Sequence, residues 1–288
     1  MTDAALAARL AEEAGTLLLE LRDRHGSSTQ TTDQRELRRA GDRAAQEYLA
    51  KELAGARPDD AVLSEEADDD RRRLTADRVW IIDPLDGTKE YAEGRSDWAV
   101  HVALWTRDGV GPVSTTAAST DAASAVNAPL GNLVAGAVAL PGRATTLSSD
   151  SVQPPEPPSP LPGSPGASRP WRIAVSRSRA PEVAERAATA LGAELVPMGS
   201  AGYKVASVVL GEVDAYVHAG GQYQWDSAAP VAVAQAAGLH ATRLDGSPLR
   251  YNDVDRYLPD LLVARPEVAD ALLAACSDAA AAVPRSHT

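Results

Sequence analysis

The chain has 288 residues, of which 44% are hydrophobic, and a formal net charge of −12. This length and hydrophobic content suffice to bury a sizeable core in one compact unit or in two closely packed halves. The negative charge argues against binding to nucleic-acid polymers, and no apolar stretch approaches the roughly 20 residues needed to cross a bilayer. The single cysteine, Cys276, excludes an internal disulfide. We expect a globular, cytoplasmic protein that binds no membrane, and the sequence leaves a homodimer open.

The first half of the chain predicts helices followed by strands. Leu and Ala recur at helical spacing over residues 6–21 and 37–49, which predicts two helices. Short apolar runs at residues 61–64, 79–82, 98–105 and 133–140 predict strands of a sheet packed on those helices. We therefore expect an α+β half over residues 1–145.

A segment rich in proline separates this half from the next. Eight prolines between residues 154 and 170 exclude a helix or a strand ladder, so residues 146–170 are expected to form a mobile surface insertion. Docking of a partner through polyproline II geometry is the alternative. Beyond it, residues 171–288 alternate predicted strands (172–176, 194–197, 213–218, 261–264) with predicted helices (182–191, 201–210, 228–237, 267–276), which indicates an α/β half.

The most informative stretch, residues 80–91, leads an apolar strand into two carboxylates. Asp83 and Asp86 lie three residues apart, and Pro84 stiffens the turn between them because its ring fixes φ. Mg²⁺ prefers oxygen ligands and is usually held by a few carboxylates together with substrate phosphate. The two carboxylates, with the carbonyl of Leu85, therefore predict a metal site.

The residues that follow predict an anion site at the same turn. Gly87 permits a close backbone approach, and Thr88 can begin a short helix whose free N–H groups face an anion. Lys89 can add a positive charge or point to solvent. Metal ions and phosphate would then meet at one turn.

Two further carboxylate clusters occur at the ends of apolar elements. Residues 61–66 end in Glu65 and Glu66, and residues 224–230 place Asp226 where an Ala-rich helix begins. An isolated D-x-x-D-G stretch is more often a solvated acidic turn, but that interpretation would have to account for all three clusters.

The three clusters together give the chain a family resemblance. Ser64–Glu66, Asp83–Thr88 and Trp225–Ala229 resemble, in this order, the signature blocks of the lithium-sensitive, magnesium-dependent phosphatases that include inositol monophosphatases, fructose bisphosphatases and bisphosphate nucleotidases. The run Lys89–Tyr91 is similar to the Lys-Glu-Phe of the 3'(2'),5'-bisphosphate nucleotidases. The resemblance implies a layered αβαβα sandwich with an active site between its halves.

The resemblance also implies the roles of individual residues. The ligands of two or three Mg²⁺ ions would be Glu65, Asp83, the Leu85 carbonyl, Asp86 and Asp226. Two metal ions about 4 Å apart would clamp the attacking and leaving oxygens and activate a water. Asp42 and Thr88 would orient that water, and the N–H groups of Gly87 and Thr88 would receive the phosphate. Gly41 departs from the polar residue that often precedes this Asp in relatives.

Substrate selectivity is expected in the second half of the chain. Arg suits bidentate capture of a second phosphate, and a strand end rich in Ser and Arg precedes a turn that resembles the family's substrate-binding turn. The candidate residues are Ser176, Arg177, Arg179, Gly199, Ser200, Lys204 and Asp226. Each cation among them has an ordinary alternative as a surface charge.

Other conspicuous residues are expected to be structural. His101 and His218 fall in predicted strands and are expected to be packed or half-exposed. The charge run 68–73, three Asp followed by three Arg, is expected to be a solvated, mobile lid edge.

The leading functional hypothesis is magnesium-dependent removal of the 3'-phosphate of 3'-phosphoadenosine 5'-phosphate, giving AMP and phosphate, in sulfur assimilation. The alternative within the superfamily is a phosphatase acting on inositol monophosphate, fructose 1,6-bisphosphate or histidinol phosphate. A non-catalytic nucleotide sensor is the alternative of a different class, although it would have no need of so many metal-type carboxylates.

Overall fold

The computed structural model describes residues 1–25, 31–107, 131–162, 164, 166–167 and 169–281. Two long helices, α1 (Asp3–His25) and α2 (Thr31–Ala56), begin the chain, as the leucine spacing predicts. Their apolar stripe, which includes Leu6, Leu10 and Leu49, is fully buried against the first sheet. The helices form because the stripe repeats every three to four residues and has a sheet face to cover.

The first sheet has the strand order β1-β2-β3-β4-β5. Its strands are β1 (Ala61–Ser64), β2 (Arg78–Asp86), β3 (Ala99–Thr106), β4 (Asn132–Leu140) and β5 (Thr145–Ser148). β1 pairs in parallel with β2, and the remaining neighbours are antiparallel. Four strands were predicted. β5, which the sequence analysis missed, adds a short edge beside β4, and the short helix α3 (Thr88–Ala92) follows β2 directly.

The second sheet has the order β7-β6-β8-β10-β9. Its strands are β6 (Arg172–Ser176), β7 (Glu194–Met198), β8 (Ala215–Tyr223), β9 (His240–Thr242) and β10 (Tyr257–Ala264), and its helices are α4 (Glu182–Leu191), α5 (Ala201–Val209), α6 (Gln224–Ala236) and α7 (Pro266–Ala281). α6 begins four residues before the predicted start, and β8 continues five residues beyond its predicted end. As a result, Asp226 lies within the first turn of a helix that starts directly where a strand ends.

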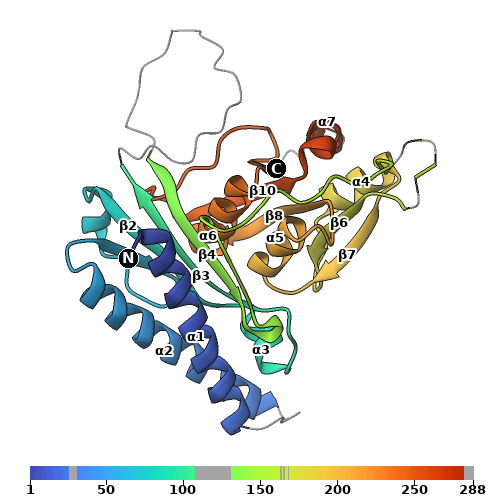
Figure 1. The fold of residues 1–288 in the computed structure, drawn as a ribbon. Helices are drawn as coiled ribbons and strands as arrows, with labels where there is room; N and C mark the ends of the chain where they lie inside the picture. The colour runs from blue at the N-terminus through green and yellow to red at the C-terminus, as the bar shows by residue number, and fades with distance from the viewer. Residues whose placement is uncertain (26–30, 108–130, 163, 165, 168, 282–288) are drawn as a thin grey trace, which may run out of the picture.

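The elements stack in five layers. Figure 1 shows α1 and α2 on one face of the first sheet, α5 and α6 between the two sheets, and α4 and α7 beyond the second sheet. Three apolar clusters fill the spaces between successive layers, and the central one surrounds α5 and α6. This arrangement is the predicted αβαβα sandwich. The C-terminal end of β2 and the start of α6 meet in its middle.

The described residues of the proline run itself, from 153 to 170, contain no helix or strand, as predicted. The predicted start of the insertion at residue 146 is wrong, because residues 146–148 belong to β5. The proline run is not a free loop, however, because side chains of the second half hold it. Arg265 Nη1 donates to the carbonyl of Glu156 at 2.8 Å, and Arg169 forms a bidentate pair with buried Asp214 at 2.6 and 2.9 Å. Pro165 lies outside the described residues.

Among the described residues, no helix has an apolar stretch long enough to cross a membrane.

Candidate metal and phosphate site

The site is built first by the end of strand β2. The pairing of β2 with β3 is interrupted between Asp83 and Asp86, where Pro84 removes a backbone donor. Asp83 is 1% exposed and Asp86 8% exposed. Asp83 Oδ1 accepts a hydrogen bond from the Leu85 N–H at 3.1 Å, but its buried Oδ2 has no hydrogen-bond partner among the described residues. A buried carboxylate oxygen without a donor is costly, and a bound cation would compensate its charge.

The start of helix α6 supplies the third carboxylate. Asp226 Oδ2 accepts a hydrogen bond from the Tyr223 N–H at 2.6 Å, which fixes the side chain at the helix entrance. One oxygen each of Asp83, Asp86 and Asp226 then lie within 4.8 Å of one another. The structure therefore brings together three of the predicted ligands from strand β2 and helix α6, which are far apart in the sequence.

The predicted fourth carboxylate, Glu65, stands just outside this group. It follows β1, which lies beside β2 in parallel, and its carboxyl contacts that of Asp83. Although part of the residue is exposed, burial of its carboxyl, helped by the charges of Asp86 and Glu66, raises the pKa of Glu65 to about 7, and the contact with Asp83 partly opposes that rise.

The electrostatics of the cluster show that it holds too much negative charge for its surroundings. Burial, together with the neighbouring carboxylates, raises the pKa of Asp83 well above its usual value. Burial and the charge of Asp86 likewise raise the pKa of Asp226 to about 7. Like charges in a low dielectric disfavour ionisation unless a cation compensates them. Oxygen-only donors of this kind suit Mg²⁺.

Asp86 is the one carboxylate of the cluster that is held in its charged form. Its Oδ2 accepts hydrogen bonds from Ser200 Oγ at 2.6 Å and from the Gly202 N–H at 2.7 Å. Burial opposes its charge, but these contacts and His101 outweigh burial and hold the pKa of Asp86 below its usual value. The predicted substrate turn therefore buttresses a metal-type carboxylate.

His101 is an unpredicted member of the site. The ring is fully buried, its Nδ1 donates to the Trp225 carbonyl at 3.1 Å, and its Nε2 lies 3.2 Å from Asp86 Oδ2. The Nε2 contact has the distance of an ion pair without the alignment of a hydrogen bond. The residue was expected only to be packed. Its place opposite Asp83 is set by the register of β2 and β3 in the folded sheet, so the sequence alone carried no signal for its role.

Lys204 lies beneath the turn rather than at its surface. Its Nζ donates to the carbonyls of Gly199 at 2.6 Å and Ser200 at 2.7 Å, and it lies 5.1 Å from the centroid of the Tyr216 ring. Burial lowers the pKa of Lys204 to about 8, despite the opposing charges of Asp86 and Glu90. Lys204 thus fixes the turn that supports Asp86.

At the strand end that was predicted to bind a phosphate, Arg177 already pairs with two carboxylates. Arg177 Nη2 donates to Glu90 at 2.7 Å and to Glu93 at 2.9 Å, both on or beside α3. Ser176 Oγ lies 3.2 Å from Ser178 Oγ, and Arg179 is exposed. Capture of a phosphate by Arg177 stays a prediction, and it would require the guanidinium to exchange carboxylate partners.

The predicted water-orienting pair, Asp42 and Thr88, comes from α2 and α3. Burial, with the charge of Glu66, raises the pKa of Asp42 to about 7, while Arg38 acts in the opposite direction. Within the described residues, no hydrogen bond joins Asp42 to Thr88, so their pairing stays a prediction.

Close packing at position 41 and backbone conformation at position 87 explain why glycine occupies these two positions. A Cβ on Gly41 would lie 2.9 Å from Leu85 Cδ2 and 3.0 Å from Tyr91 Cε1, so the departure from the family pattern allows α2 to approach the metal turn closely. Gly87 has φ 88° and ψ 44°, a left-handed conformation that favours glycine, and it is the N-cap of α3. Its role in phosphate binding stays a prediction.

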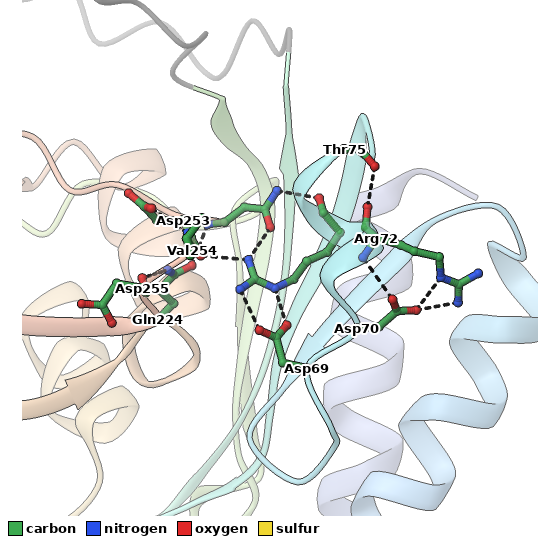
Figure 2. Close-up of polar contacts among 10 residues, drawn as sticks. Asp69, Asp70, Arg72, Thr75, Gln224, Asp253, Val254 and Asp255 are labelled. Atoms are coloured by element: carbon green, nitrogen blue, oxygen red, sulfur yellow. Dashed lines mark hydrogen bonds and ion pairs between the residues drawn. The ribbon is translucent and has the colours of Figure 1, made fainter.

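The acidic and basic run at residues 68–73 is exposed at Asp68, Asp70, Arg71 and Arg72, as expected for a solvated edge, but its last residue is not. Arg73 is fully buried: it donates to Asp69 at 2.6 Å, and to Asn252 Oδ1 and the Asp253 carbonyl at 2.9 Å each. Asn252 Nδ2 returns a bond to the Arg73 carbonyl at 3.0 Å, and the Asn252 N–H donates to Gln224 at 2.6 Å. Figure 2 shows this network between residues 69–75 and the loop at 252–255.

The network joins two segments that each carry a candidate ligand. Arg73 belongs to the segment that follows Glu65, and Gln224 is the first residue of α6, two residues before Asp226. Nothing in the sequence pattern indicates the network, because a run of six charged residues is normally solvent-exposed. The burial of Arg73 is evident only in the folded chain, where Asn252 and Asp253, about 180 residues away in the sequence, accept its hydrogen bonds.

Comparisons with known proteins find relatives along almost the whole chain. The profile of the inositol monophosphatase family matches residues 2–280. The chain is 50% identical over 274 residues to the 3'-phosphoadenosine 5'-phosphate phosphatase of Mycobacterium leprae (strain TN), covering 95% of this chain and 93% of that protein. It is 29% identical to the 3'(2'),5'-bisphosphate nucleotidase CysQ of Escherichia coli (strain K12), covering 76% of this chain and 81% of that protein.

Solved structures support the fold. The extragenic suppressor protein suhB from Bartonella henselae superposes with a TM-score of 0.67 at 19% identity, covering 96% of this chain and 99% of that one. Inositol monophosphatase II from Staphylococcus aureus MSSA476 superposes with a TM-score of 0.67 at 20% identity, covering 93% and 94%. The family profile spans nearly the whole chain, and a relative with half of its residues identical is matched almost end to end. The chain therefore belongs to the inositol monophosphatase family.

Proposed function

We propose that the chain is a magnesium-dependent phosphatase that removes the 3'-phosphate of 3'-phosphoadenosine 5'-phosphate to give AMP and phosphate. The observation that carries the proposal is the convergence of Asp83, Asp86 and Asp226 within 4.8 Å, with a buried oxygen of Asp83 lacking any partner among the described residues. The substrate is proposed from the 50% identity to a phosphatase named for this nucleotide.

The donor chemistry suits magnesium. Every group in the cluster is a carboxylate oxygen, a hard ligand, and no sulfur or imidazole nitrogen belongs to the three-carboxylate group that the structure describes. We propose that Glu65 and the Leu85 carbonyl complete the ligand set for two or three Mg²⁺ ions. When bound, the ions would supply the positive charge that the transferred phosphate and the attacking oxygen need.

Residues of the chain would hold the metal ions in place and activate the attacking water. Asp86 is kept charged and oriented by Ser200, Gly202 and His101, so it offers a preformed ligand. Asp42 would accept a proton from the attacking water at its carboxylate, with Thr88 as its orienting partner; its pKa of about 7 suits that task near neutral pH.

The phosphate and the nucleotide would be held by neighbouring groups. We propose that the N–H groups of Gly87 and Thr88 contact the transferred phosphate. The second phosphate would lie toward the strand end and the buttressing turn. The proposed residues there are Ser176, Arg177, Arg179, Gly199, Ser200 and Lys204. Lys204 acts by fixing the carbonyls of the turn.

A substrate panel tests the proposal. Phosphate release is measured from 3'-phosphoadenosine 5'-phosphate, inositol 1-phosphate, fructose 1,6-bisphosphate and histidinol phosphate, each with Mg²⁺ and with EDTA. We expect the bisphosphate nucleotide to have the highest kcat/KM and EDTA to abolish release. A preference for inositol 1-phosphate would replace the substrate assignment, and nucleotide binding without turnover of any substrate would favour the sensor.

The cellular setting is part of the same proposal. We propose a cytoplasmic enzyme of sulfur assimilation that binds neither nucleic-acid polymers nor membranes, which the net charge of −12 supports by repelling polyanions. Fractionation of cells producing the tagged chain checks the location, and gel filtration with light scattering checks whether the chain is a homodimer.

A further inference from the structure

An exposed aromatic patch adjoins the carboxylate cluster. The described chain exposes six large hydrophobic residues, and three of them, Tyr223, Val254 and Tyr257, belong to segments that meet at the start of α6. Tyr223 is 43% exposed, Tyr257 41% and Val254 61%. Large exposed apolar groups that gather at one place commonly mark a binding surface.

The patch is rigid. Tyr223 and Tyr257 are cross-strand partners at the ends of β8 and β10, and their ring centroids lie 5.9 Å apart in an edge-to-face arrangement. Trp225 stacks on Tyr223, with 5.0 Å between centroids and 13° between planes, and is itself only 6% exposed. The Tyr257 hydroxyl accepts a hydrogen bond from the Gly221 N–H at 3.0 Å. An aromatic ring held in this way loses little entropy when it binds a ligand.

The patch is also directly connected to the metal-type carboxylates. The Tyr223 N–H donates to Asp226 Oδ2 at 2.6 Å, so the residue that carries the exposed ring also fixes a candidate ligand. Strand β8 ends at Tyr223 and helix α6 begins at the next residue. The backbone that carries the ring therefore lies beside a candidate ligand, so the ring is within one side-chain length of the carboxylate cluster.

We propose that Tyr223, backed by Trp225 and flanked by Tyr257, is the stacking surface for the purine base of the substrate. The inference rests on the proposed function, since it concerns the base of the same nucleotide. A flat base attached through one sugar to the phosphate at the metals needs a flat aromatic partner next to a metal ligand, and base–aromatic stacking is sequence-tolerant but strong.

The test compares substrates that differ only in the base. The 3',5'-bisphosphates of adenosine and uridine and an abasic analogue are assayed with the wild-type chain, Tyr223→Leu and Tyr223→Phe. In Tyr223→Leu we expect the ratio of kcat/KM for the adenosine compound to that for the abasic analogue to fall about tenfold, the range of one stacking interaction. In Tyr223→Phe, which keeps the ring, the ratio should stay within about twofold, since the hydroxyl is not part of the stack.

Leu210→Ala is the matched control. Leu210 has the same exposure as Tyr257, at 41%, but lies at the end of α5, outside the patch. The base selectivity of the Leu210→Ala variant should equal that of the wild type. Direct binding of AMP, measured by calorimetry without turnover, should weaken in Tyr223→Leu and not in Leu210→Ala.

The possible failures are distinguishable. If the wild-type chain does not hydrolyse the adenosine bisphosphate, the proposed function fails and the stacking surface with it. If the wild type hydrolyses it and Tyr223→Leu keeps the same base selectivity, the stacking surface alone is refuted. If Tyr223→Leu instead changes a dimer to a monomer at unchanged selectivity, the patch is an interface between copies of the chain and the inference is overturned.

Discussion

Removing one charge from the carboxylate cluster should stabilise the metal-free protein. In Asp226→Asn, the amide oxygen can still accept the bond from the Tyr223 N–H, so the helix start keeps its geometry. The pKa of Asp226 rises from 3.8 to about 7, a difference of about three pKa units. At about 1.36 kcal/mol per unit, this corresponds to a ceiling of about 4 kcal/mol against the charged form in the folded state.

The direction of the pH dependence of stability follows from which state binds the proton more tightly. Between pH 4 and pH 7 the folded state keeps the proton on Asp226 while the unfolded state releases it, so the contribution of this group to stability falls as the pH rises through that range. The amide that replaces the carboxyl in the variant does not titrate. The variant should therefore equal the wild type at low pH and become more stable as the pH approaches 8. We expect a gain of about 1 to 3 kcal/mol, because the neighbouring carboxylates share the repulsion.

The assay is thermal unfolding in EDTA and in Mg²⁺ from pH 5 to pH 8. In EDTA at pH 8 the variant should melt about 2 to 6 °C above the wild type, at about 2 °C per kcal/mol for a chain of this size. Mg²⁺ should raise the melting temperature of the wild type and not that of the variant. Asp59→Asn, which makes the same change at an exposed carboxylate, corrects for net charge. A metal-free variant that melts at or below the wild type at pH 8 would refute the reasoning.

Three further predictions concern the same region. Asp83→Asn should abolish phosphate release and Mg²⁺ binding while circular dichroism shows a native fold; wild-type turnover would contradict its role as a ligand. Arg73→Met should lower the free energy of unfolding by about 3 kcal/mol, because Asp69 is left with an unpaired charge, and should raise the Mg²⁺ concentration for half-maximal activity; urea unfolding and a metal titration measure the two effects. Gly41→Ala should destabilise by about 1 to 3 kcal/mol through its contact with Leu85, whereas Gly55→Ala, on the same helix with open space around it, should be neutral or slightly stabilising; equal effects would exclude the close approach as the cause.

The sequence determined those features that depend on residues close together in the chain. The two N-terminal helices follow from leucine spacing, and the carboxylates at 83 and 86 follow from a strand that runs directly into a stiffened turn. The resemblance of three short blocks indicated the fold and the convergence of Asp226 with the other two. Such features can be predicted from the sequence because local backbone preference and hydrophobic period act within a few residues.

Tertiary structure decided everything that required a partner from elsewhere in the chain. The burial of Arg73 depends on Asn252, the contact of His101 with Asp86 depends on the pairing of β2 with β3, and the ion pairs of Arg177 depend on where α3 lies. A charged side chain is solvated unless a distant segment supplies its hydrogen bonds, and its own neighbours in the sequence carry no record of that segment. The metal-type carboxylates could thus be named from their motifs, whereas the groups that orient them emerged only when the two sheets packed around α6.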